Sequence, residues 1–220
     1  MRHLVLAVAS LIVVVSNAYG AINLELRPSM AVVAPGQSVA LGLYAVSDSA
    51  INQSLGSFQA VLAWTPSFLH LRGATAPPGS PLLALGFFHD AYGLNESMPP
   101  ADGSGLLIGL GPLGGSLAAT QGGLLLGTLN FTALAPTLPT TSVIIADSGG
   151  TPPVKTLVLD GDRPNVDVTG ALSGATVRIV PAPSSAVLLA AGLVFARQRR
   201  ACLKSSPGTE PGTSRPSPPV

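Results

Sequence analysis

Residues 57–64 read SFQAVLAW, and this short stretch decides the fold class. Phe58, Ala60, Leu62 and Trp64 occupy every second position, so in an extended chain their side chains share one face. A period of two is typical of a β-strand that buries one face and leaves the other toward solvent. The stretch therefore predicts a half-buried strand in a sheet that has a hydrophobic core on one side.

The same alternation recurs on both sides of this stretch, in residues 37–45 and 174–179. Denser apolar runs, which predict more deeply buried strands, occupy residues 106–110, 124–134, 142–146 and 154–159. Turn-forming Pro and Gly residues separate these segments, and no window has the period and caps of a long amphipathic helix. Eight or nine such strands predict an all-β fold, a β-sandwich of the jelly-roll type over residues 21–179.

The composition of the 220-residue chain agrees with this fold class. Only 10% of the residues are charged and 47% are hydrophobic, while 25 glycines and 21 prolines favour short strands joined by turns over a helical bundle. The length fits one domain with additional segments at its ends. The single cysteine, Cys202, follows the predicted domain and excludes an intrachain disulfide.

Charge is distributed unevenly along the chain. Residues 21–179 carry nine acidic and five basic side chains, a net charge of −4, whereas residues 180–220 carry one acidic and five basic side chains, a net charge of +4. A mildly acidic domain argues against a nucleic-acid partner. The basic side chains of the tail directly follow an apolar run, which is the pattern of a membrane-directed segment.

The first 20 residues have the three parts of a signal peptide. A short basic start is followed by an apolar stretch over residues 4–15, too short for an ordinary transmembrane helix, and then by small residues. We expect signal peptidase to cleave before Ala21 or before Tyr19. The alternative interpretation, a buried first strand or helix, does not explain this order of basic, apolar and small residues.

The segment after the predicted domain, residues 180–200, has a second recognisable order. A Pro-Ala-Pro entry precedes an apolar run over residues 186–196, and an arginine cluster follows the run. The residues that define this pattern are Pro181, Ala182, Pro183, Arg197, Arg199 and Arg200. The positive-inside rule would hold the arginines on the cytoplasmic side of a membrane and leave the domain outside. A plain membrane anchor and an ordinary buried helix are the alternative interpretations.

This order resembles the PEP-CTERM sorting signal of exported bacterial proteins, in which Glu usually stands where this chain has Ala182. The resemblance implies a transmembrane helix in the inner membrane and processing by an exosortase-type transpeptidase at the Pro-x-Pro segment. The remaining residues, 201–220, extend beyond the usual end of such a signal. Their Pro, Ser, Gly and Thr content predicts a disordered tail.

Three stretches of the predicted domain resemble the cohesin-like modules of the carbohydrate-binding-domain superfamily: residues 33–39, 56–71 and 127–134. The order and spacing of the three stretches match as well. The resemblance implies a β-sandwich of about nine strands, of the kind that many exported bacterial proteins carry. Cellulosomal members bind dockerin modules through one sheet face, but no such face maps onto these residues, so the fold alone is carried over.

A glycine-rich string is the first candidate for chemistry. Gly109, Gly111 and Gly114 match the G-x-G-x-x-G pattern of dinucleotide-binding proteins. That pattern needs a helix directly after it and an acidic residue about 20 positions further on, and this chain offers neither. The string is therefore interpreted as a glycine-rich loop.

A cluster of oxygen-bearing side chains is the candidate metal site: Asp160, Asp162, Asn165 and Asp167. Calcium binds compact loops with such hard ligands, although the EF-hand spacing fails because its acidic position twelve falls on Ala171. A solvated turn with local hydrogen bonds is the favoured interpretation, and a structural calcium ion is the alternative.

The histidines and aromatic residues of the domain are the remaining candidates for a functional site. His70 and His89 are far apart in the chain, and there is neither a G-x-S-x-G elbow nor a cysteine for zinc within the domain, so no enzymatic activity is predicted. The candidates for an aromatic sugar platform are Trp64, Phe87, Phe88 and Tyr92. Trp64 belongs to the apolar face of the 57–64 stretch, which places it in the core. The sequons at Asn52, Asn95 and Asn130 are interpreted as chance matches.

The sequence therefore predicts an exported, non-enzymatic bacterial surface or matrix-associated β-sandwich that is sorted by its C-terminal signal. Signal peptidase, the exosortase-type enzyme and the membrane are its expected partners, and no cofactor is expected. The alternative is a membrane-anchored module that binds an extracellular carbohydrate, such as a polysaccharide, or a protein. The two hypotheses differ in whether one sheet exposes an aromatic or polar patch.

Overall fold

The computed structural model describes residues 20–181, and within them every regular element is a strand. The first sheet has the strand order β14-β1-β3-β9-β5 and is antiparallel except for the β1–β14 pair. Its strands are β1 (Ile22–Pro28), β3 (Ser38–Ser47), β5 (Leu69–Thr75), β9 (Leu124–Ala133) and β14 (Thr169–Ser173).

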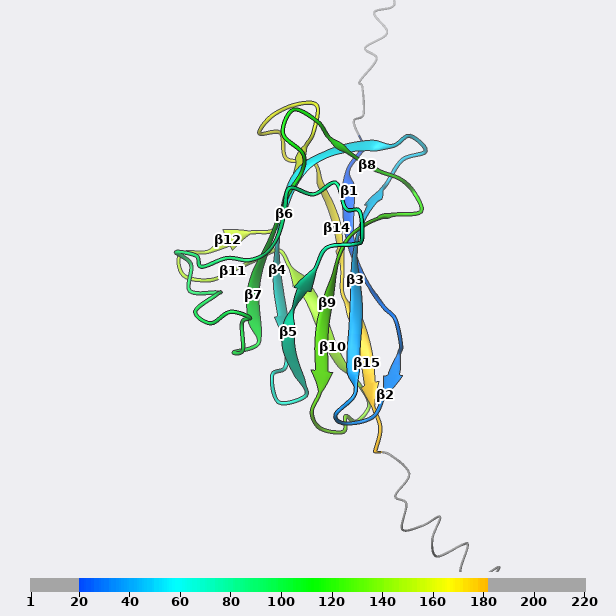
Figure 1. Ribbon diagram of the computed structural model, residues 1–220, viewed down its shortest axis with the longest axis vertical. Coiled ribbons are helices and arrows are strands. Elements are labelled where there is room, and N and C mark those ends of the chain that lie inside the picture. Colours follow the sequence, from blue (N-terminus) through cyan, green and yellow to red (C-terminus); the bar gives the residue numbers. More distant parts are fainter. Residues whose placement is uncertain (1–19, 182–220) are drawn as a thin grey trace, which may run out of the picture. The chain divides into compact units, whose positions relative to one another are not determined.

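The second sheet has the main order β2-β15-β10-β4-β7-β6, with β13 and β8 also paired to the long strand β4. Its strands are β2 (Val32–Val33), β4 (Gln53–Trp64), β6 (Ala84–Phe87), β7 (Ser104–Leu110), β8 (Leu117–Ala119), β10 (Thr141–Ala146), β13 (Leu157–Asp160) and β15 (Ala175–Ile179). A small separate ribbon joins β11 (Ser148–Gly149) to β12 (Val154–Lys155). The long strands of both sheets run along the same axis (Figure 1).

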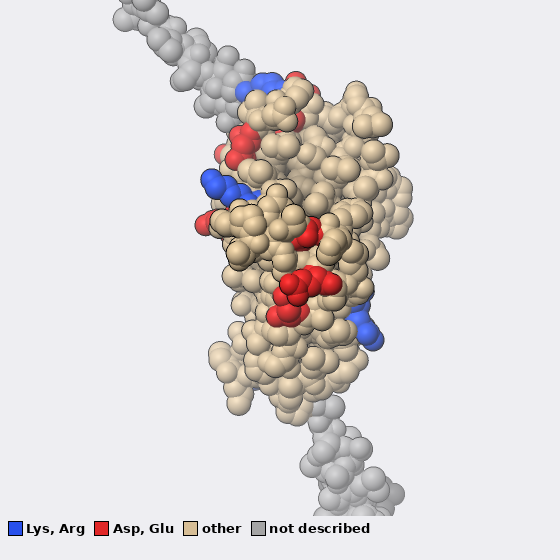
Figure 2. Space-filling model, turned by 90° about the vertical axis from the view of Figure 1, so that its left-hand side faces the viewer, with Lys and Arg blue, Asp and Glu red and all other residues tan. Residues whose placement is uncertain are grey.

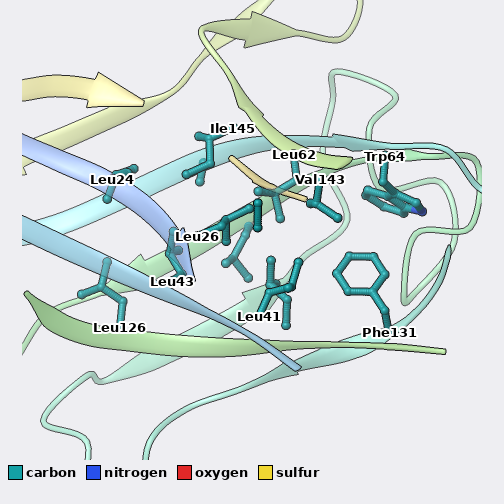
Figure 3. Packing of buried hydrophobic residues seen from close by; sticks show 14 of the residues in the cluster. Leu24, Leu26, Leu41, Leu43, Leu62, Trp64, Leu126, Phe131, Val143 and Ile145 are labelled. Carbon is teal, nitrogen blue, oxygen red and sulfur yellow. The ribbon is translucent and has the colours of Figure 1, made fainter. Parts of the chain in front are cut away.

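The core lies between the two sheets and is built by the predicted alternation. Phe58, Ala60, Leu62 and Trp64 of β4 are all buried and belong to one hydrophobic cluster. The strands of the first sheet contribute the facing side, where Phe131 meets Trp64 edge-on with ring centroids 5.6 Å apart and an interplanar angle of 73° (Figure 3). Edge-to-face contacts of this kind are favoured by the charge distribution of aromatic rings. The all-β sandwich predicted from residues 57–64 is confirmed.

The predicted number of strands is too low. The described residues contain fifteen strand segments instead of about nine. Part of the difference comes from interruptions, because the ribbon of β11 and β12 separates β10 from β13, which both pair with β4. The chain leaves the sheet for ten residues, 147–156, and returns to the same partner strand, and the two short strands of the ribbon add to the count.

The two ends of the described chain lie at opposite ends of the sandwich. β1 begins at the upper end in Figure 1, and β15 finishes at the lower end. The predicted signal peptide and most of the predicted sorting segment lie outside the described residues, as does the predicted tail. Between residues 20 and 181, none of the structure is a helix that could cross a membrane.

Candidate binding groove

The outward faces of the two sheets differ in chemistry. On the first sheet, the outward side chains are mostly polar, and several bond to one another. Arg27 of β1 forms an ion pair with Glu25 at 2.8 Å and lies over the ring of Tyr44, 4.4 Å from its centroid. Asn130 and Thr132 alternate with buried residues on β9 in the same layer. This face is an ordinary solvated surface.

The outward face of the second sheet is apolar along its middle strands. Val61 of β4 and Leu106 of β7 lie opposite each other in the ladder, so their side chains share this face. Both are buried, because Leu94 and Val154 pack onto them and form a second hydrophobic cluster outside the main core. Leu94 belongs to residues 88–100, which we call the cap, and Val154 belongs to the β11–β12 ribbon.

One buried side chain fastens the cap to the sheet. Asn95 is 1% exposed, and its Nδ2 donates to the carbonyl oxygens of Phe88 at 2.7 Å and Leu106 at 2.8 Å. Its Oδ1 accepts a hydrogen bond from the Leu106 N–H at 2.9 Å. Strand β6 pairs with β7 only as far as Leu107, so the Asn95 amide continues the ladder where the neighbouring strand ends.

Beyond the cap and the ribbon, the outward face stays open. Here β4 lies between β13 and β7, and its Gln59 faces Leu157 on one side and Ile108 on the other. Two residues along β4, Ser57 faces Leu159 and Leu110 in the same way. The four aliphatic side chains form two ridges, and Ser57 and Gln59 form the floor between them. We call this site the aliphatic groove; its cavity has a volume of about 130 Å³.

The groove has one closed end and one open end. At the closed end, Gln59 Nε2 donates to the carbonyl oxygen of Lys155, which belongs to the ribbon. At the other end the groove widens into a depression shared with the β7–β8 loop and the turn after β13. Leu83 and Leu113, which are 60% and 88% exposed, lie beside this mouth. Large aliphatic side chains exposed in one continuous area commonly mark an interaction site.

Acidic side chains dominate the surroundings of the groove. Residues 88–167 include seven acidic and two basic side chains, a net charge of −5, and these lie on the cap, on the ribbon and in the loops around them. Figure 2 views the side of the molecule that carries the ribbon. Acidic groups gather near its centre, and most of the remaining surface is uncharged. A partner therefore meets a negative potential around an apolar groove.

The candidate calcium ligands form the turn at the mouth of the groove. Asp160 Oδ1 accepts hydrogen bonds from the N–H groups of Asp162 and Arg163, at 2.8 and 3.2 Å, and its Oδ2 accepts one from Arg163 Nε at 2.8 Å. Asp162 accepts a hydrogen bond from the Ser54 hydroxyl, and Asp167 Oδ1 accepts from Thr169.

The other features of this turn agree with its interpretation as a solvated turn. Asn165 has a φ of 63°, a left-handed conformation that Asn tolerates in turns. Among the described residues, no three His, Cys, Asp or Glu side chains converge as the ligands of a metal ion would. The hydrogen bonds of this turn are those that the favoured interpretation describes, and a structural calcium ion stays the alternative prediction.

The pKa of Asp160 is lowered from its ordinary value of 3.8. Burial by itself would raise this pKa, but the hydrogen bonds from Asp162 and Arg163, together with the positive charge of Arg163, outweigh it. A lowered pKa in the folded state means that the ionised carboxylate stabilises the fold above the unfolded pKa. This contribution is lost as the pH falls through the folded pKa.

We therefore predict that Asp160→Asn lowers the free energy of unfolding by about 1 kcal/mol at pH 7, a modest value because Arg163 is partly exposed to solvent. The difference between Asp160→Asn and wild type should shrink as the pH falls through the lowered pKa of folded Asp160, because the wild-type carboxylate then becomes protonated. Urea denaturation at a series of pH values measures both effects. Asp48→Asn is the control because Asp48 is an exposed carboxylate with no ion pair among the described contacts. A pH-independent difference would contradict this account.

The glycine string is part of the sheet and of the loop after it. Gly109 lies in β7 opposite Phe58, and a Cβ at this position would lie 2.0 Å from the Phe58 ring, so only glycine fits beneath that ring. Gly114 has a φ of 70° in the loop between β7 and β8. No helix follows the string, in agreement with the interpretation as a glycine-rich loop.

The remaining candidates are dispersed. His70 points outward from β5, half-buried, and His89 is exposed on the cap, with its Nδ1 3.4 Å from the Asn95 carbonyl oxygen. The aromatic platform is not formed, because Trp64 lies in the core, Phe87 packs against the core and Tyr92 packs against the second cluster. Phe88 alone of the four is substantially exposed, at 44%.

Sequence reasoning did not find the groove. The apolar runs 106–110 and 154–159 were predicted to be deeply buried, and this is correct only in part. Leu106 is buried beneath the cap, and Val154 of the ribbon is buried in the same cluster. Leu110, in contrast, is 42% exposed. The usable signal was the loss of alternation, which shows that both faces of these strands are apolar. Asn95, which matched a sequon, gave no signal of its role in fastening the cap.

The geometry defines a cohesin-like β-sandwich with an apolar outward face. No protein-family model matches the chain, and no curated protein matches it. A cohesin module of a family 33 glycoside hydrolase from Clostridium perfringens has a TM-score of 0.51 at 14% identity, covering 74% of this chain and 99% of that module. The sixth cohesin of scaffoldin B from Acetivibrio cellulolyticus, in complex with a Cel5 dockerin mutant, has a TM-score of 0.50 at 15% identity, covering 73% and 99%. These similarities establish the fold.

Proposed function

We propose that this chain is an exported, non-catalytic module that binds a partner protein in the aliphatic groove. The observation that carries this proposal is the pair of aliphatic ridges that face solvent on one sheet of the sandwich, while the outward face of the other sheet is polar. A solvated sheet normally alternates apolar residues inside with polar residues outside. Four aliphatic side chains directed toward solvent along a groove depart from that pattern, and binding explains the departure.

The fold supports a protein as the partner. The Acetivibrio cellulolyticus cohesin has a dockerin bound to it, so a sandwich of this architecture is compatible with binding another protein module. The groove itself supports a protein more than a sugar, because its walls are aliphatic. Phe58, the one aromatic residue that lines it, is buried in the main core and offers no exposed ring for a sugar. Carbohydrate-binding platforms rely on exposed aromatic rings, and three of the four candidate rings are packed against hydrophobic clusters.

The test is a selection of peptide binders on the purified full chain, with a library displayed on phage. Sequences enriched on the wild type should bind the double variant Leu110→Asp, Leu159→Asp at least about tenfold more weakly, because each charge removes an apolar contact from the groove. Ile144→Asp is the matched control, since Ile144 is 48% exposed on the same face of the same sheet but lies outside the groove. Binders that ignore the double variant would contradict the proposal.

Export is supported by the two end segments of the sequence. In this proposal, signal peptidase removes residues 1–20, and residues 180–200 hold the protein in the inner membrane until an exosortase-type enzyme processes them. The intact mass of the protein from its native host, measured with cell fractionation, tests this part. A mature form that begins near Ala21 and ends between Pro181 and Ser185 outside the inner membrane supports sorting. A form that keeps Val220 in the inner membrane contradicts it.

A further inference from the structure

We infer that the segment received by the aliphatic groove is an extended strand with apolar side chains at alternate positions, followed by a lysine- or arginine-rich stretch. This inference rests on the proposed function, since it names the chemistry of the partner for the same groove. Three observations carry it: the width of the groove, its volume and the charge at its open end.

The width excludes a helix. The ridges stand on β13 and β7, which flank β4 on its two sides. Neighbouring strands lie about 4.8 Å apart, so the backbones that carry the ridges are about 10 Å apart and the side chains narrow the space further. An α-helix with its side chains is about 10–12 Å across, which is too wide to enter between the ridges. An extended segment fits along the outward face of β4.

The volume of the groove and the spacing of its rows determine the size and spacing of the side chains that the bound segment can place in it. A cavity of about 150 Å³ holds one benzene molecule in a well-studied apolar site, so the 130 Å³ of the groove holds one leucine- or phenylalanine-sized anchor. The depression at the mouth, beside Leu83 and Leu113, takes a second apolar group. The rows at Gln59 and Ser57 are two residues apart, about 7 Å, which is the distance between alternate side chains of an extended strand.

The charge at the open end of the groove determines which residues are favoured in the part of the peptide that leaves through it. The turn that borders the mouth contains three carboxylates, those of Asp160, Asp162 and Asp167, and one cation, Arg163, which pairs with Asp160. The closed end also has acidic groups, Asp147 just before the ribbon and Asp90 and Glu96 of the cap, beside one base, Lys155. It offers the peptide no exit, however, because Gln59 is bonded to the ribbon there. A peptide that leaves through the mouth therefore meets net negative charge there, and cationic residues on that side are favoured over acidic ones.

Three fluorescent peptides of ten residues test the inference by anisotropy with the full chain. The first has two leucines two positions apart followed by three lysines, the second has three glutamates in place of the lysines, and the third has serines in place of the leucines. We expect the first to bind about tenfold more tightly than the second at low ionic strength, with the preference shrinking as salt is added. The third peptide should bind most weakly.

Variants locate the effect. Leu110→Ser should weaken the first peptide about tenfold, whereas Ile144→Ser should leave its affinity unchanged. The isosteric pair Asp162→Asn, Asp167→Asn should remove the preference for lysine while the leucine dependence stays. If the lysine and glutamate peptides bind equally well and both depend on Leu110, the inference on charge is overturned and the proposed function stands. If no peptide depends on Leu110, the groove is not the binding site and both are overturned.

Discussion

Replacing Phe131 by alanine should lower the free energy of unfolding by about 3–5 kcal/mol, because the change removes a fully buried ring and leaves a cavity beside Trp64. Phe131 is 1% exposed and lies in β9 between Val39 of β3 and Leu71 of β5. The ring therefore lies on the inner face of β3, β9 and β5 and packs against Trp64 of β4, the strand that forms the floor of the groove. Domains of this size have a total stability of about 5–15 kcal/mol, so the loss is a large fraction of it.

Urea denaturation measures this effect. Trp64 is the only tryptophan, so its fluorescence reports on this part of the core, and far-UV circular dichroism reports on the sheets independently. With an ordinary dependence on denaturant, the midpoint should fall by at least about 1 M urea. Thr132→Ala is the control, since Thr132 is the next residue of β9 and faces outward, and its effect should stay within about 0.5 kcal/mol. An unchanged midpoint for Phe131→Ala would show that the two sheets do not pack as described.

Asn95→Ala should release the cap from the sheet. The substitution leaves the buried N–H and C=O groups of Leu106 without their hydrogen-bond partner, at a cost of about 1–3 kcal/mol each. The carbonyl of Phe88 also loses its bond, but this bond is only partly buried, so water can replace it. We expect the free energy that keeps the cap on the sheet to fall by about 2–4 kcal/mol. The rest of the domain should be affected less, because Asn95 is not part of the main core.

Hydrogen exchange followed by mass spectrometry separates this local effect from global unfolding. Exchange in residues 88–100 and at the Leu106 amide should accelerate more than about thirtyfold in Asn95→Ala, while β3 and β9 keep their protection. Glu96→Gln is the matched control because Glu96 is the exposed neighbour of Asn95. Equal exchange in the cap of both variants would mean that Leu94 and Val154, rather than Asn95, hold the cap in place.

The sites of these two predictions could be identified from the sequence to very different degrees. The first is the contact between Phe131 and Trp64, and the second is Asn95. Trp64 was assigned to the core from the alternation of residues 57–64, and the structure confirms the assignment. Asn95 had no such pattern around it, because its role depends on Leu106, eleven positions away on a strand that begins after the cap. A side-chain amide that extends a β-ladder carries no periodic signal.

The sequence by itself determined the sandwich, because the side chains of a strand alternate between its faces whatever the rest of the chain does. It also determined that residues 106–110 and 157–159 are apolar on both faces. Only the tertiary structure decided which of those outward side chains are covered. The cap and the ribbon lie over Val61 and Leu106, but they end before Leu110 and Leu159. How far the cap and the ribbon extend over the sheet depends on contacts between distant parts of the chain. The groove is open because neither segment extends over Leu110 and Leu159.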